Sequence, residues 1–96
     1  SLDVTTAIKK AVTYLQDAFQ DESISDIRLE EIEFDDAKGS WVVTFSFLRK
    51  VADQELPRVH QQLAPLTGGG YRREYKSVHV DAGTGEFKSI KMRMAV

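Results

Sequence analysis

The chain has no cysteine among its 96 residues, which excludes disulfides, thiolate nucleophiles, zinc fingers and iron–sulfur clusters. Small secreted domains often depend on disulfides, so this absence favours a reducing compartment. No apolar run approaches the roughly 20 residues of a membrane span, and no basic-then-apolar signal segment is visible at the start. We therefore expect a cytoplasmic protein without a membrane span. An exported form with its signal removed stays open as an alternative.

Residues suited to catalysis or metal binding are also scarce. The two histidines, His60 and His79, lie in no Ser/His/Asp or metal-ligand pattern. The stretch "DAGTGE" lacks the oxygen side chains that a calcium loop needs at its third and fifth positions. Strand alternation splits the acidic run over two faces, which favours a solvated edge over a cation site; the run is Glu30, Glu31, Glu33, Asp35 and Asp36. The sequence thus predicts no catalytic residue, no metal and no cofactor.

Charge is plentiful but unevenly placed along the chain. Residues 1–36 hold ten acids and three bases, whereas residues 37–96 hold five acids and ten bases. We expect acidic and basic strands of one sheet to complement each other, and a molecule with an acidic and a basic pole is the alternative. The length suits a single domain spanning residues 1–96.

The segment "DVTTAIKKAVTYLQDAFQ" predicts an amphipathic helix, because its apolar residues recur at spacings of three and four. Asp3 or Thr5 is expected to cap the start by accepting a backbone N–H. The clearest strand is "SWVVTFSFLRK", in which Trp41, Val43 and Phe45 alternate with more polar residues.

The strand before it, "ISDIRLEEIEFDD", changes parity along its length. Ile27 and Leu29 share one parity, while Ile32 and Phe34 share the other. A β-bulge near Glu30-Glu31 would bring all four apolar residues to one face.

The last two strands are predicted in "YRREYKSVHVD" and "EFKSIKMRM". Tyr71 and Tyr75 differ in parity from the valines that follow, which favours a second bulge near Lys76-Ser77. In the turn between the strands, Asp81 is expected to accept backbone hydrogen bonds. Gly83 and Gly85 are expected to supply positive φ angles there.

Residues 51–70 break the strand pattern with prolines and three consecutive glycines. We expect a long loop or a short helix there, which is a long connection for so small a domain. The whole order predicts an α+β domain, in which an N-terminal helix packs on one face of a four-stranded antiparallel sheet. The loop or short helix joins strands 2 and 3.

The sheet face opposite the predicted helix has no second layer to cover it. Leucine and tyrosine on such a face suit a protein interface, and a solvated face is the alternative. The candidates for a partner-binding surface are Val42, Thr44, Ser46, Leu48, Tyr71, Tyr75 and His79.

Basic and aromatic residues of the last two strands could instead bind single-stranded nucleic acid. The residues concerned are Tyr71, Arg72, Arg73, Tyr75, Lys76, Lys88, Lys91 and Arg93. The acidic pI near 5.6 and the absence of RNP signatures argue against this function.

The strand "SWVVTFSF" and the hairpin "YKSVHVDAGTGEFKSI" resemble the PepSY-type domain family and, more loosely, cystatin-like α+β folds. The matching residues are Trp41, Val43, Tyr75, Val78, Val80, Asp81, Thr84, Gly85 and Glu86. The resemblance covers most of the chain except residues 51–70, and it extends to small bacterial proteins. It implies a binding or regulatory module without catalytic residues that modulates a peptidase.

These observations lead to two expectations about function. The first is a small non-enzymatic module that acts by protein–protein contact, with a homodimer as one form of that contact. The alternative is a small-ligand-binding or enzymatic cystatin-like cone, with a cavity between the helix and the curved sheet.

Overall fold

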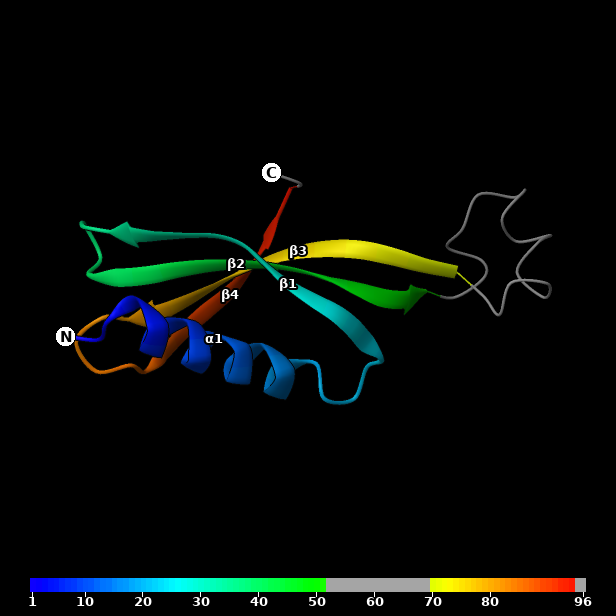
Figure 1. Ribbon diagram of the computed structural model, residues 1–96, viewed down its shortest axis with the longest axis horizontal. Coiled ribbons are helices and arrows are strands. Elements are labelled where there is room, and N and C mark those ends of the chain that lie inside the picture. The colour runs from blue at the N-terminus through cyan, green and yellow to red at the C-terminus, as the bar shows by residue number, and fades with distance from the viewer. Residues whose placement is uncertain (52–69, 95–96) are drawn as a thin grey trace.

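The computed structural model describes residues 1–51 and 70–94. One helix and four strands follow in the order α1 (Val4–Ala18), β1 (Ile24–Asp35), β2 (Ser40–Val51), β3 (Gly70–Asp81) and β4 (Phe87–Arg93). The strands form one antiparallel sheet in sequence order, and α1 lies along one face of it (Figure 1). The predicted α+β architecture is confirmed. The expected loop or short helix falls almost wholly outside the described residues.

Helix α1 begins where the sequence predicts. Asp3 is the N-cap, and its Oδ1 accepts a hydrogen bond of 2.8 Å from the backbone N–H of Thr6. Ala7, Ala11 and Leu15 form the stripe that faces the sheet, and all three are fully buried. Because two of these three side chains are small alanines, the helix backbone can pack closely against the sheet.

The core lies between α1 and the two central strands. Val43, Phe45 and Phe47 of β2, together with Val78 and Val80 of β3, are at most 1% exposed. Burial of each such side chain contributes about 1.5–3 kcal/mol to folding. Figure 1 shows that β2 and β3 run on beyond the C-terminal end of the helix. The helix therefore covers only part of its face of the sheet.

Strand β1 contains two register shifts against β2. One lies between Ser25 and Arg28, and the other lies between Leu29 and Glu31, at the bulge that parity predicts. Together the shifts bring Ile24, Ile27 and Ile32 against the core. The sequence pattern indicated one bulge in this strand and missed the other.

The second predicted bulge, near Lys76-Ser77, is wrong. The pairing of β2 with β3 is continuous over the whole of both strands. Tyr71 and Tyr75 therefore keep their own parity and lie on the face opposite α1. No bulge is needed, because the tyrosines stay on the open face and do not have to join the core beneath the helix. The nearby register shift belongs instead to the β3–β4 pair, between His79 and Val80.

The turn between β3 and β4 is held by its own side chains and by α1. Oδ1 of Asp81 accepts hydrogen bonds of 2.9 Å from the N–H groups of Gly83 and Thr84, as predicted. Gly85 has a φ of +80°, whereas Gly83 does not have a positive φ, so that part of the prediction is wrong. The turn therefore needs only one residue with a positive φ, and that residue is Gly85. A Cβ at Gly85 would lie 2.8 Å from Cε of Lys10.

Candidate functional site

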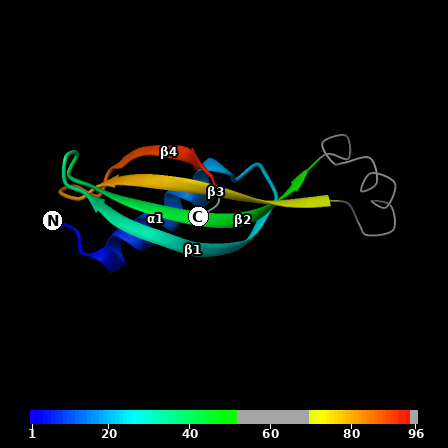
Figure 2. The ribbon, with the colours of Figure 1, turned by 90° about the horizontal axis from the view of Figure 1, so that it is seen from above.

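The seven residues predicted as a partner-binding surface all lie on the face opposite α1, called here the open face. Residues paired directly across an antiparallel ladder share a face, and the register pairs Val42 with His79 and Ser46 with Tyr75. The same alternation places the remaining three on this face, namely Thr44, Leu48 and Tyr71. Figure 2 shows β2 and β3 in the middle of the sheet, with β1 and β4 at its edges.

The exposure of these seven residues differs sharply. Thr44 and Ser46 are fully buried, although α1 lies on the other face of the sheet. Tyr71 is 56% exposed, and the other four are half-buried. The small polar side chains at the centre of the open face are therefore covered, whereas the residues around them are at least partly accessible.

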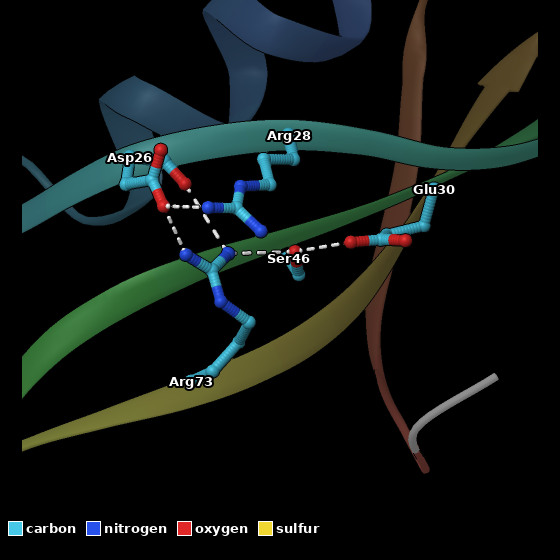
Figure 3. A network of polar contacts seen from close by, with 5 residues as sticks. All are labelled: Asp26, Arg28, Glu30, Ser46 and Arg73. Atoms are coloured by element: carbon cyan, nitrogen blue, oxygen red, sulfur yellow. Dashed lines mark hydrogen bonds and ion pairs between the residues drawn. The ribbon is translucent and has the colours of Figure 1, made fainter.

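One polar network buries Ser46 (Figure 3). Nη1 of Arg73 donates to Oγ of Ser46 at 2.8 Å, and Nη2 pairs with the carboxylate of Asp26. The hydroxyl of Ser46 donates in turn to Oε2 of Glu30 at 2.6 Å. Arg28 adds a second cation, 2.8 Å from Oδ2 of Asp26. The network thus joins β3 to β1 across β2.

The backbone at Asp26 is adapted to this network. Asp26 has a φ of +51°, and no other described residue except glycine has a positive φ. Aspartate and asparagine tolerate this left-handed region better than other side chains. The residue lies within the first bulge of β1, and its carbonyl oxygen accepts a bond of 3.3 Å from Arg73. The bulge therefore presents both the carboxylate and the carbonyl to one guanidinium.

A second network buries Thr44. Nη1 of Arg93 donates to Oγ1 of Thr44 at 3.1 Å, and Nη2 lies 3.2 Å from Oε1 of Glu31. Thr44 also shares a hydrogen bond of 2.7 Å with Ser77. Arg93 and Glu31 belong to the two edge strands, which would be about 14 Å apart in a flat sheet. The two long side chains therefore bridge the central strands over the open face.

These contacts satisfy the buried polar groups of the face. Among the described residues, every buried side-chain nitrogen and oxygen has a hydrogen-bond partner. Within residues 1–51 and 70–94, no three His, Cys, Asp or Glu side chains gather as metal ligands would. Burial, together with the nearby Lys91 and Lys38, lowers the pKa of His79. His79 is thus a neutral side chain at pH 7 that pairs across the strand with Val42.

A groove of about 360 Å³ opens where β4 ends beside β3. The last paired residues are Tyr75 and Arg93, so β3 continues from there without β4 alongside. The lining comes from both faces of the sheet, and it consists of Arg72, Arg73, Glu74, Tyr75, Lys76, Met92, Arg93 and Met94. The groove therefore wraps the edge of β3 at the end of the sheet.

The one acid of the groove is bound to an arginine of β2. Nε and Nη2 of Arg49 lie 3.0 and 2.8 Å from Oε1 of Glu74. This hydrogen bonding lowers the pKa of Glu74. Tyr75 follows Glu74 directly and so points to the other face of the strand. The two side chains therefore do not form an acid–base pair.

Sequence reasoning found part of this groove and missed the rest. Tyr75 was a candidate, whereas Met92 and Met94 were not, although they are 80% and 82% exposed. The available signal was an apolar residue at every second position of a strand at the edge of the sheet. The groove itself depends on where β4 stops relative to β3, which the sequence pattern does not determine.

Comparisons of the chain with protein-family models, with curated proteins and with solved structures found no match. The resemblance to PepSY-type and cystatin-like domains therefore stays a hypothesis drawn from the hairpin and the central strand. Among the described residues, no helix is both long and apolar enough to cross a membrane. The site must accordingly be interpreted from its own geometry.

Proposed function

We propose that the chain is a small non-enzymatic binding module that captures an extended segment of a partner protein in the groove between β3 and β4. The observation that carries this proposal is the edge of β3. Strand β4 pairs with β3 only as far as Tyr75, so β2 is the sole described strand in register with β3 beyond that point. An unpaired strand edge offers backbone N–H and C=O groups, and an extended peptide can add to it as a further strand.

The side chains around this edge support peptide binding. Met92 and Met94 are the most exposed large apolar residues among those the structure describes. Methionine side chains are flexible and polarisable, and they adapt to partners of different shape. Tyr75 contributes an aromatic ring to the same groove. Backbone pairing would supply affinity, and these three side chains would supply contacts to alternate residues of the bound segment.

This proposal keeps the expectation of protein–protein contact but moves the contact to one end of the sheet. The centre of the open face is a poor partner surface, because Thr44 and Ser46 are buried and their hydroxyls already have hydrogen-bond partners. The PepSY-type resemblance makes a peptidase the first partner to try. A second copy of the chain is another, through pairing of sheet edges in a homodimer. A bacterial source and a cytoplasmic location remain hypotheses.

A small-ligand or enzymatic cone is the less favoured alternative. Such a function would need space between α1 and the sheet. Leu15, Phe45 and Phe47 occupy that region and are at most 1% exposed.

Selection of binders from a library of random linear peptides would test the proposal. We expect a common extended motif to emerge, with affinities measured by calorimetry. The double variant Met92→Asp/Met94→Asp should weaken binding by about tenfold or more. Leu29→Asp is the matched control, because it alters an exposed apolar residue on the opposite edge strand.

Peptides methylated on alternate backbone nitrogens would test strand addition itself. A methylated nitrogen cannot donate a hydrogen bond, so methylation of the donors that face β3 should abolish binding. Unchanged affinity for both methylated forms would rule out strand addition. Failure of the library to yield any binder would contradict the proposed function as a whole. Sedimentation of the unmodified protein would show whether a second copy occupies the groove.

A further inference from the structure

We propose that copies of this chain associate side by side, with β4 of one copy pairing with β1 of the next in a continued antiparallel sheet. These are the two outermost strands among those that the structure describes. Each carries a large apolar side chain that is exposed, Phe34 on β1 and Phe87 on β4. A strand at the edge of a sheet is a template for a further strand. A second copy of the chain can therefore extend the sheet at either edge.

The two outer strands carry opposite charge. β1 contains five acids and one arginine, whereas β4 contains three bases and no acid. Part of this charge is already paired within the chain, because Arg93 binds Glu31. Arg28 likewise binds Asp26. The remaining charged side chains form no ion pair with another described residue, and they are Glu30, Glu33 and Asp35 on β1 and Lys88 and Lys91 on β4. The strands thus stay complementary when the paired groups are set aside.

The rows of residues that cross the sheet define a register for this contact. Pairing within the chain links Glu31 of β1, through β2 and β3, to Lys91 of β4. Because β1 and β4 run in opposite directions, a neighbouring copy in the same orientation continues this row as an antiparallel pair. Its Glu31 then lies directly opposite Lys91 and its Glu33 lies diagonally opposite, and both positions are within reach of a long side chain. Since Glu31 also holds Arg93, Glu33 is the carboxylate that Lys91 can contact without breaking an ion pair.

The same register brings apolar residues together on the helix side of the sheet. Ile90 falls opposite Ile32, and Phe87 falls opposite Phe34. Aromatic and β-branched cross-strand pairs stabilise antiparallel sheets. Both register shifts of β1 come before Glu31, so the half of the strand that forms this contact is regular.

Charge favours a head-to-tail contact over a two-fold dimer. A two-fold dimer would set β1 against β1 or β4 against β4, and each choice places like charges opposite each other. A contact between two different edges leaves one edge of each outer copy unoccupied. Such contacts produce rings or open chains of copies.

Two cysteine variants test the register, and the chain has no thiol of its own to interfere. Glu33→Cys marks β1, and Ser89→Cys marks β4 in the same row. Facing residues of an antiparallel pair have Cα atoms about 4.5–5.5 Å apart, which suits a disulfide. After the two variants are mixed and oxidised, mass spectrometry should show disulfides between them well above the share expected for random collisions. A random mixture, or an excess of either homodimer, would overturn the head-to-tail contact.

Charge reversal tests what drives the association. A contact made by one short strand is small, so we expect a dissociation constant of about 0.1–1 mM by sedimentation equilibrium. Lys91→Glu should weaken association about tenfold, and the further change Glu33→Lys should recover most of that loss. Lys9→Glu is the matched control, because it makes the same charge change on the exposed side of α1.

The outcomes separate this inference from the proposed function. Protein that stays monomeric at about 1 mM would overturn the side-by-side contact. A Lys9→Glu effect as large as that of Lys91→Glu would also overturn it, since net charge alone would then explain the loss. A mass that stops at two chains as the concentration rises would overturn the head-to-tail arrangement. Peptide capture would stand in each case, because its groove lies where β4 ends and not along the outer side of that strand. Thermal melting of each variant confirms that the fold is retained.

Discussion

The two faces of the sheet are both buried at their centres, but by opposite means. On the helix face, Phe45 and Val78 lie in the apolar core cluster together with Ala11 and Leu15 of α1. On the open face, Thr44 and Ser77 are equally inaccessible, yet what lies over them is the guanidinium of Arg93. One face is covered by a helix and the other by long charged side chains of β1, β3 and β4.

The comparison shows that a second layer of secondary structure is not needed to bury a sheet face. Arginine can lay its aliphatic stem over a surface while its charged end stays paired. On the open face, the side chains of Arg93 on β4 and Glu31 on β1 are long enough to meet over the central strands. The two faces should nevertheless differ in energy. Loss of apolar packing costs several kcal/mol, whereas one net hydrogen bond contributes about 1 kcal/mol.

The largest effect is expected for Phe45→Ala on the helix face. Phe45 is 1% exposed and lies in the core cluster with Leu15. Removing its ring should lower the free energy of unfolding by about 3–5 kcal/mol, through lost transfer energy and a residual cavity. Urea denaturation followed by circular dichroism measures this change.

Phe34→Ala is the matched control for that variant. Phe34 lies on the same face but is 44% exposed at the edge strand, where it contacts Trp41 edge-on. We expect a loss of about 1 kcal/mol or less. Equal losses at the two phenylalanines would show that the helix does not define the core.

A smaller effect is expected for Thr44→Val on the open face. The substitution conserves shape but removes the oxygen that Arg93 and Ser77 both contact. It should cost about 1–3 kcal/mol, because Ser77 is left buried with an unpaired hydroxyl. Equilibrium unfolding in urea gives the value.

Ser77→Ala, alone and combined with Thr44→Val, completes the cycle. If the open face depends on this hydrogen bond, the double variant should lose less stability than the two single losses together. Strict additivity would mean that the two hydroxyls act independently and that the network is not the covering layer.

The helix face could be predicted from sequence because it depends on local periodicity. The stripe of α1 and the alternation of β2 identify Leu15, Phe45 and Phe47 as inward, and all three are buried. The bulge near Glu30 could also be predicted, since the apolar residues on its two sides had to reach one face. In each case one type of residue repeats at a fixed spacing.

The open face could be predicted only as a list of residues and not as a structure. Alternation grouped Thr44 and Ser46 correctly on that face, but it suggested exposure, whereas both are buried. Their covering arginines come from β3 and β4, far along the chain, and reach acids on β1. Such pairing depends on contacts between strands far apart in the sequence and on the left-handed residue Asp26, and neither has a periodic signature. The groove was found only in part, because it depends on where β4 stops beside β3, which has no periodic signature either.

Glu31→Gln tests the ion pair that closes the open face, and we expect a modest loss. The side chains of both Glu31 and Arg93 are 35% exposed, so screening by solvent limits the contribution of the pair. The free energy of unfolding should fall by about 0.2–1 kcal/mol at low salt, and by less as the salt concentration rises. Denaturation at two ionic strengths measures this difference. A loss that does not depend on salt would point to packing instead of charge.

The smallest effect concerns pH and also belongs to the open face. Burial and neighbouring lysines lower the pKa of His79 in the folded chain. The unfolded chain then binds the proton more readily, so His79 contributes stability above about pH 6.5, and this contribution falls away as the pH drops toward the lowered pKa. Proton NMR should show the His79 ring titrating below the pKa of a histidine in a free peptide, with His79→Gln assigning the signal. A pKa at or above that of a histidine in a free peptide would mean that water reaches the open face around His79 and Val42. The polar side chains that bury Thr44 and Ser46 would then not cover His79.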